Sequence, residues 1–419
     1  MITQFSCKNF RNINIDELEF GRINLLLGPN NAGKSNFIKA LSFGANMITM
    51  KNEAAESGFL AEVQRDGAFD ILRKDASKPE IELKWRILLE QQEVDYKLIF
   101  HVGSSLDEFY IMLESLDDAD NSGFYSIPFN FFRCHDKKSG EGYFSTARKL
   151  GEKNARVIVP VRSDETVFRQ FDKLVITNDK LNNRTYIRET LFSILEDMKS
   201  FFGRFYACAS SMFDFAKVRE LCEVSETGKV LKRDASNFVA VYRYQCVANA
   251  DFKEQFLENA QMLMHDLSNI YVEEAFGKMA MTLVRGGQKY RLADVSDGTI
   301  EALIILLILS LSDEQHPTLI AIDEPEVNLH PAWQKILAKW IQTNGNFVQC
   351  FISTHSPDFL DEFTENFALG KVNIFVSEIS QDITFQKVKR ERIENEIKEG
   401  WQLGDLYRVN DPAIGGWPW

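Results

Sequence analysis

The feature that most constrains this chain is the octapeptide GPNNAGKS at Gly28–Ser35, which fits the phosphate-loop pattern G-x-x-x-x-G-K-[ST]. The apolar run before it, Ile23–Leu27, is typical of a buried strand, and Asn36–Leu41 is typical of a helix start. Gly28 and Gly33 allow the backbone to curl, so that successive N–H groups can bind an anion at the positive end of the helix. The alternative, an ordinary glycine turn, has no need of the Gly-Lys-Ser sequence. We therefore expect a site for nucleotide phosphates.

Carboxylates that suit such a site follow a second apolar run, Leu319–Ile322, which predicts another buried strand. In a parallel sheet, residues at the carboxyl end of a strand lie where ligands bind, beside the phosphate loop. Asp323 would hold Mg²⁺ through water, and Glu324 would orient and deprotonate the attacking water. In the loop, Lys34 would reach the β- and γ-phosphates and Ser35 would ligate Mg²⁺. The alternative for the carboxylates is a charged strand end that faces solvent.

A third predicted strand, Val348–Ile352, is followed by Ser-Thr-His355-Ser-Pro. A His at this position can donate a hydrogen bond to a γ-phosphate, although a lone His is more often structural.

Another constrained segment is Ser296-Asp-Gly-Thr299, which precedes the mainly apolar run Ile300–Leu309. This run predicts a buried helix that is too short to cross a bilayer. Ser296 is expected to cap the helix, and Gly298 permits close backbone approach. An ordinary N-cap would also explain these residues. The functional interpretation adds a second anion site at the helix N-terminus, which would complete the site of another subunit.

Together, these four segments resemble the ABC-ATPase heads of the SMC/RecF/OLD group, especially a compact prokaryotic "predicted ATPase" branch found with phage-defence genes. In that group they are the Walker A loop, the signature, the Walker B strand with its D-loop, and the His switch. The resemblance implies an α/β fold: a P-loop ABC-ATPase head with a split core, N-terminal antiparallel strands and a mainly helical insertion. It extends to Phe5–Ile13, to Asp234–Asn237 and to the closing segment Leu403–Gly416.

The resemblance also implies site residues for ATP and Mg²⁺. Glu324 and His355 would be catalytic, and Ser35, Asp323 and the Q-loop candidate Gln170 would serve the metal. A lone Gln on a surface helix is the alternative for Gln170. The nucleotide would be bound by Asn30, Asn31, Ala32, Gly33, Lys34, Ser35 and Asn36, and by Ser296 and Gly298 of the opposite subunit.

Three regions follow from the positions of these motifs: an N-terminal lobe (1–162), a mainly helical insertion (163–280) and a C-terminal lobe (281–419). Ile81–Leu88 and Tyr96–Val102 alternate at period two and predict strands, whereas Ile187–Met198 has helical periodicity. Asp117–Gly123 is a loop by composition. No run of heptads predicts a coiled coil, which separates this chain from the long-armed members of the group.

Composition predicts a cytoplasmic protein. The 419 residues are 45% hydrophobic and 26% charged, and no apolar run is long enough to span a membrane. The six Cys lack paired spacing, so free thiols are expected. The net charge of −13 argues against a surface that grips DNA as a whole, although a local basic groove remains open.

The chain has 33 Phe, and some of them are candidate stacking platforms for nucleic acid. The candidates are Phe129–Phe132, Phe201, Phe202 and Phe205, for which core or interface packing is the expected alternative. The basic run Lys387–Arg392 is expected to be solvated surface, with a phosphate contact as the alternative.

Three functions are compatible with these features. In the first, a homodimer or higher homo-oligomer hydrolyses ATP and switches a separate effector, a nuclease or toxin, in antiviral defence. OLD-type proteins usually carry a nuclease domain after the head, and about 60 residues follow His355 here, fewer than an ordinary domain. The second is a RecF-like DNA-binding repair clamp. The third, a transport ATPase subunit, is disfavoured by the Ser296-Asp-Gly signature.

Overall fold

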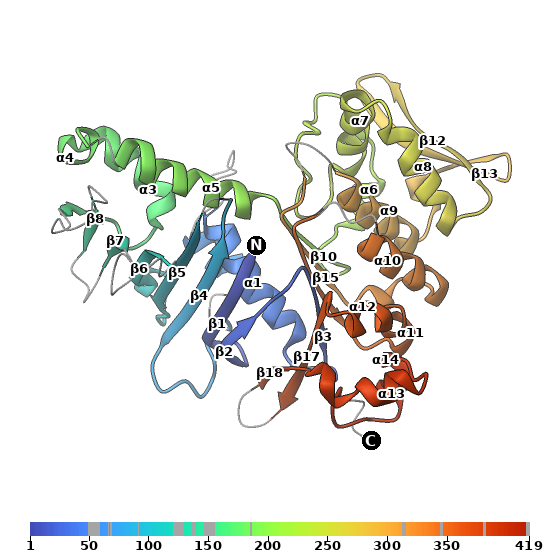
Figure 1. The fold of residues 1–419 in the computed structure, drawn as a ribbon. Helices are drawn as coiled ribbons and strands as arrows, with labels where there is room; N and C mark the ends of the chain where they lie inside the picture. The colour runs from blue at the N-terminus through green and yellow to red at the C-terminus, as the bar shows by residue number, and fades with distance from the viewer. Residues whose placement is uncertain are drawn as a thin grey trace. The chain divides into compact units, whose positions relative to one another are not determined.

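A computed structural model describes residues 1–48, 59–65, 67, 69–90, 92–119, 130–135, 140–145, 156–184, 187–311, 316–343, 347–379 and 383–415. The chain folds as two compact units, whose elements are labelled in Figure 1. The first unit contains Met1–Arg22, Asn30–Phe205 and Phe375–Lys387. The second contains Ile23–Pro29, Tyr206–Ile374 and Val388–Trp419.

The first unit combines a row of strands with helices that cover it. The strands lie in the order β18, β2, β1, β4, β5, β6, β7, β8 and β9. Their bounds are β1 Ile2–Phe10, β2 Ile13–Glu19, β4 Glu80–Leu88, β5 Glu93–His101, β6 Tyr110–Asp118, β7 Asn130–Cys134, β8 Glu141–Ser145, β9 Arg156–Pro160 and β18 Ile383–Lys387. The helices are α1 Lys34–Ile48, α2 Phe59–Arg65, α3 Val167–Thr177, α4 Asp179–Asn182 and α5 Phe192–Gly203, with a π-helical turn at Ile187–Leu191.

Antiparallel pairing of β1, β4, β5 and β6 confirms the expected N-terminal strands. Alternate residues of β4 and β5 are buried, as the period-two pattern predicts. Trp85 of β4 stacks on Tyr96 of β5 and lies against α1. At this contact α1 has Gly44, where a Cβ would come within 2.3 Å of the Trp85 indole. A residue with a side chain at position 44 would therefore push α1 off the sheet.

The second unit contains parallel strands and a separate antiparallel sheet. Its elements are β3 Ile23–Leu27, β10 Phe205–Ala209, β11 Cys222–Glu223, β12 Leu267–Ala275, β13 Lys278–Arg285, β14 Gln288–Arg291, β15 Leu319–Asp323 and β16 Gln349–Thr354. The helices are α6 Phe215–Arg219, α7 Phe238–Ala248, α8 Phe252–Leu263, α9 Asp297–Ser310, α10 Pro331–Thr343, α11 Pro357–Asp361, α12 Thr364–Ala368, α13 Glu394–Lys398 and α14 Leu403–Arg408. β17, Val372–Ile379, begins in this unit and ends in the first.

Parallel pairing of β15, β16 and β3 sets the position of the candidate site. Asp323 is in register with Ser353, and Thr354 is in register with Leu27. The three strands are mainly buried on both faces and rich in apolar residues, which is typical of the interior of a parallel sheet. Since β15 and β16 end at one edge, the residues that follow these two strands are brought together there.

The predicted insertion, 163–280, is mainly helical but also contains β10, β11, β12 and part of β13. Its residues are divided between the two compact units near residue 205. In the family-like segment Asp234–Asn237, the buried Asn237 donates to the carbonyl oxygens of Val230 (2.8 Å) and Thr227 (3.2 Å). This segment therefore holds the loop before α7.

Buried positions of the aromatic candidates favour core packing over nucleic-acid stacking. Phe131, Phe132, Phe201 and Phe202 are buried, and Phe205 is half-buried. Phe129, the loop residues 120–123 and the terminal residues 416–419 lie outside the described residues.

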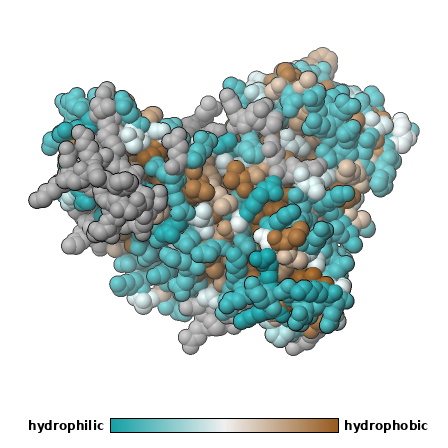
Figure 2. Space-filling view, in the orientation of Figure 1, coloured by the Kyte–Doolittle hydropathy of each residue, from teal (hydrophilic) through white to brown (hydrophobic). Residues whose placement is uncertain are grey.

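The face drawn in Figure 2 is mostly hydrophilic, with apolar residues in small groups. Exposed large apolar side chains are dispersed: Ile176 lies on α3, Val247 on α7 and Phe276 in the turn between β12 and β13. None of the described helices combines the length and apolar character that a membrane-spanning helix requires.

Candidate nucleotide site

The phosphate loop follows β3 directly, as its sequence predicts. Gly28, with φ of 149°, is the first residue after the strand, and α1 begins at Lys34. Asn31 and Gly33 both have left-handed backbones, with φ of 65° and 78°. A Cβ on Gly33 would lie 2.8 Å from Ile13 Cγ2. Position 33 therefore requires Gly for two reasons: there is no room for a side chain, and the backbone is left-handed.

The residues after Gly33 form the first turn of α1. The side chain of Lys34 is buried, with 3% exposed. A buried ammonium group requires oxygen partners, which suits a residue that binds phosphate. Asn36 donates to the side-chain oxygen of Asn12 at 2.7 Å, which ties the helix start to the β1–β2 turn. Ala32 is buried, whereas Asn30 and Asn31 are exposed.

In the second unit, Asp323 and Glu324 lie at the carboxyl end of β15, next to Ser353 of β16. The Ser353 hydroxyl donates to Asp323 Oδ1 and accepts from the Glu324 backbone N–H at 3.0 Å. One hydroxyl group thus orients both residues of the predicted metal and catalytic pair. The sequence analysis did not single out Ser353, although it lies in the same segment as His355.

Glu324 has a left-handed backbone, with φ of 49° and ψ of 61°. For a residue other than Gly this conformation costs about 1–3 kcal/mol, and such strain is concentrated at functional sites. It occurs between β15 and the short 3₁₀ turn Pro325–Val327. The turn brings Glu324 toward His355, so that Glu324 Oε1 lies 3.7 Å from His355 Nδ1.

Glu326, which the sequence analysis did not identify, holds the segment around His355. Its Oε1 atom accepts from the His355 backbone N–H at 2.6 Å. The Thr354 hydroxyl donates to the same carboxylate at 3.0 Å, and His355 Nε2 lies 3.7 Å from Glu326 Oε1. The His355 ring is therefore flanked by Glu324 and Glu326. The sequence feature that could have pointed to Glu326 is the second Glu of the segment Asp-Glu-Pro-Glu.

The predicted cap of α9 is present. Ser296 Oγ accepts from the Thr299 backbone N–H at 3.3 Å, and every residue from Thr299 to Leu309 is buried. Gly298 allows the close approach that its sequence position predicts, and the neighbouring backbone is that of Asn328 in the segment after β15. Asp297 forms an ion pair with Arg219 at 2.6 Å.

A second contact between the same two segments involves the buried Glu301 of α9. Its carboxylate accepts from Asn328 Nδ2 at 2.8 Å and from the Ser210 hydroxyl at 2.9 Å. Burial raises the pKa of Glu301 above its ordinary value. The signature helix and the segment after Walker B are therefore joined through both backbone and side-chain contacts.

Gln170 lies on α3 in the first unit. Its amide oxygen accepts from the Arg162 backbone N–H at 3.0 Å, and its amide nitrogen donates to the carbonyl oxygens of Arg162 and Glu165. These contacts hold the turn before α3 and do not favour a metal role. That role stays a prediction.

Comparison with known proteins identifies the family of the chain. Residues 1–360 match the model of the AAA ATPase domain family (AAA_15). The chain is 22% identical over 371 residues to Endonuclease GajA of Bacillus cereus (strain VD045), a similarity that covers 86% of this chain and 56% of that protein. The chain therefore spans little more than half of the length of this relative.

One of two similar solved structures supports the same fold. The SmcHead bound to the C-winged helix domain of ScpA has a TM-score of 0.50 at 12% identity, covering 93% of this chain and 99% of that chain. The SMC head domain from Thermotoga maritima has the same identity and coverage, with a TM-score of 0.40. The expected α/β ATPase-head fold is confirmed by the family match and the first of these structures. The chain belongs to the AAA ATPase domain family and is an SMC- and OLD-like ATPase head.

Proposed function

We propose that this ATPase head binds ATP with Mg²⁺ and hydrolyses it. The observation that carries the proposal is the group formed by Asp323, Glu324 and His355 at one edge of the parallel strands, with Glu324 held in a strained backbone conformation. The phosphate loop supplies the complementary groups, a buried Lys34 and the Ser35 hydroxyl. This combination of cation, hydroxyl and carboxylates suits a triphosphate with a hard divalent cation.

The residues would divide the chemistry among them. The N–H groups of Asn30–Ser35 and the Lys34 ammonium would bind the phosphates. Asp323 and Ser35 would hold Mg²⁺, which when bound neutralises charge on the phosphate oxygens. Glu324 would orient the attacking water and accept its proton, and His355 would donate a hydrogen bond to the γ-phosphate. ATP turnover by the purified protein, lost in Glu324→Gln, is the direct test.

We further propose that two heads form composite sites, in which Ser296 and Gly298 of one subunit face the nucleotide of the other. The support is the N-cap geometry of Ser296 at the start of α9, since a helix N-terminus binds anions. The family resemblance gives this position to the trans-acting signature.

The ATP cycle would control a separate effector, a nuclease or toxin, in antiviral defence. The similarity to Endonuclease GajA supports an effector of the nuclease class, and the resemblance to heads found with phage-defence genes supports the setting. Co-purification of the native partner tests this proposal. DNA-stimulated ATP turnover with steep salt dependence would instead favour the RecF-like clamp.

A further inference from the structure

Glu326 has an environment that differs from that of a surface carboxylate. Its side chain is 11% exposed, and its two oxygens accept hydrogen bonds from the Thr354 hydroxyl and the His355 backbone N–H. Both donors lie at the carboxyl end of β16, whereas Glu326 lies in the turn after β15. The carboxylate therefore links the ends of two neighbouring strands at the position of the two proposed catalytic residues.

These contacts determine where the His355 ring lies. The hydrogen bond from the His355 N–H to Glu326 Oε1, 2.6 Å long, fixes the backbone of His355 itself. The bond from Thr354 fixes the preceding residue. With the backbone of Thr354 and His355 held by Glu326, the His355 ring lies between Glu324 and Glu326, 3.7 Å from each carboxylate.

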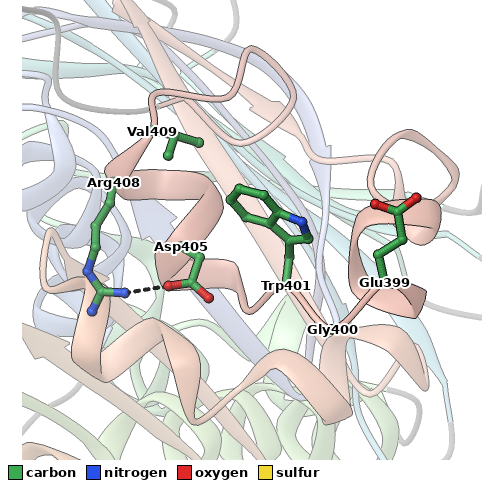
Figure 3. Close-up of a pocket in the computed structure, with 6 residues that line it drawn as sticks. All are labelled: Glu399, Gly400, Trp401, Asp405, Arg408 and Val409. Atoms are coloured by element: carbon green, nitrogen blue, oxygen red, sulfur yellow. Dashed lines mark hydrogen bonds and ion pairs between the residues drawn. The ribbon is translucent and has the colours of Figure 1, made fainter.

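The segment after His355 is held by α14. Asp361, at the end of α11, accepts from the Gly404 backbone N–H at 2.7 Å. Arg408 pairs with Asp358 of α11 at 2.7 Å. It also pairs with Asp405 of its own helix, and Figure 3 shows this second pair. Because α11 begins at Pro357, two residues after His355, these contacts fix the chain on the far side of the ring.

A buried residue of α14, Tyr407, is influenced by the charge of Glu326. Tyr407 is 3% exposed, and its hydroxyl has no hydrogen-bond partner among the described residues. Burial, and secondarily the charge of Glu326, raises the pKa of Tyr407 to about 12. The phenol therefore stays neutral within the electrostatic reach of this carboxylate.

We propose that Glu326 is a positioning residue for ATP hydrolysis, which acts by holding Thr354 and the His355 backbone so that the His355 ring stays beside Glu324. The inference rests on the proposed function, in which Glu324 and His355 perform the hydrolysis. It goes beyond that function because it assigns a separate task to the second carboxylate of the Asp-Glu-Pro-Glu segment.

The test uses the full chain and four single variants. Glu326→Ala removes the acceptor and should lower kcat by about tenfold or more, with KM for ATP within about twofold, because the phosphate loop is untouched. Glu326→Gln should lose less than about threefold, since its amide oxygen still accepts from His355 and its amide nitrogen still donates to Thr354. Thr354→Val, which keeps the side-chain shape, should lower kcat by an intermediate factor. Glu365→Ala, on the exposed face of α12, is the matched control and should match the wild type.

A double-mutant cycle separates positioning from general damage. In a His355→Ala background, Glu326→Ala should lower kcat by less than about twofold, because the residue through which it acts is gone. An equal loss in both backgrounds, or unchanged kcat in Glu326→Ala alone, would overturn the inference. A wild-type protein without ATP turnover would overturn the proposed function and this inference with it. If the wild type hydrolyses ATP and Glu326→Ala has the same kcat, the inference about Glu326 is overturned and the proposed function is not.

Discussion

The space in which a Cβ of residue 298 would lie is occupied by the carbonyl oxygen of Asn328, at 2.3 Å. Gly298 is in the signature segment and Asn328 follows Walker B, so the backbones of two motifs are in direct contact within one subunit. The segment after β15 is therefore packed against the start of α9, the surface that we propose faces a second head.

This contact predicts the effect of Gly298→Ala. The added methyl group meets a backbone oxygen that cannot rotate away, so α9 must shift, at a cost of about 1–3 kcal/mol. We expect a lower melting temperature and reduced ATP turnover. Ser310→Ala, at the other end of α9, removes only a hydroxyl bonded to the Leu306 carbonyl of the same helix and serves as the control. If Gly298→Ala had the melting temperature and ATP turnover of the wild type, the contact with Asn328 would not constrain α9.

Substitution of the proposed base, Glu324, and of the proposed phosphate-binding residue, Lys34, should have different effects on ATP binding and turnover. Glu324→Gln keeps the shape of the side chain but removes the base, so ATP should stay bound while kcat falls by about 10²–10⁴-fold. Lys34→Ala should abolish ATP binding, because it removes the cation for the phosphates. Nucleotide affinity and single-turnover rates distinguish the two results. Undiminished turnover in Glu324→Gln would refute its role as the base.

Mixed subunits test the composite site. Lys34→Ala and Ser296→Arg should each be inactive, the second because Arg fills the shared cleft. In a mixed dimer one site carries both substitutions and the other carries neither. Random exchange should therefore restore about a quarter of wild-type turnover, since half of the dimers are mixed and each keeps one intact site. Subunit exchange without recovered turnover would speak against a signature that acts in trans, provided that the two sites act independently.

The proposal of a separate effector predicts that the purified chain does not cleave DNA in Mg²⁺ or Mn²⁺. Plasmid and linear DNA, with and without ATP, provide the assay. Addition of the native partner should produce the effector activity. DNA cleavage by the chain alone, lost on substitution of its own residues, would refute the separate-effector proposal.

A buried carboxylate in the first unit predicts a pH effect on stability. Glu114 accepts from Tyr96 Oη at 3.1 Å and from the Val167 backbone N–H at 2.8 Å, and burial raises the pKa of Glu114 to about 8 from an ordinary value of 4.5. Between these values the native state retains a proton that the unfolded state has lost. The contribution of Glu114 to the free energy of unfolding therefore falls as the pH rises from 4.5 to 8.

The variant Glu114→Gln cannot ionise. Its amide oxygen can still accept from the Val167 backbone N–H, and its amide nitrogen can donate to Tyr96 Oη. Its melting temperature should change less between pH 5 and pH 8 than that of the wild type. The difference in melting temperature, variant minus wild type, should be largest at pH 8. Equal pH dependence of melting in the two proteins would show that Glu114 does not hold the proton.

Local chemistry along the sequence was sufficient to predict the phosphate loop, its strand and helix, and the buried character of α9. Gly28, Gly33 and Ser296 act on their immediate neighbours, so their positions in the motifs already imply their backbone roles. The alternating pattern of β4 predicted a half-buried strand for the same reason.

The partners of the catalytic segment were decided by tertiary structure alone. Asp323 and Ser353 are 30 residues apart, and their hydrogen bond depends on the register of β15 with β16, which is set by packing along both strands. The same holds for Glu326 with His355, and for Gly298 with Asn328. A motif specifies which chemical groups are present. Only the register and packing of distant segments determine which of those groups touch.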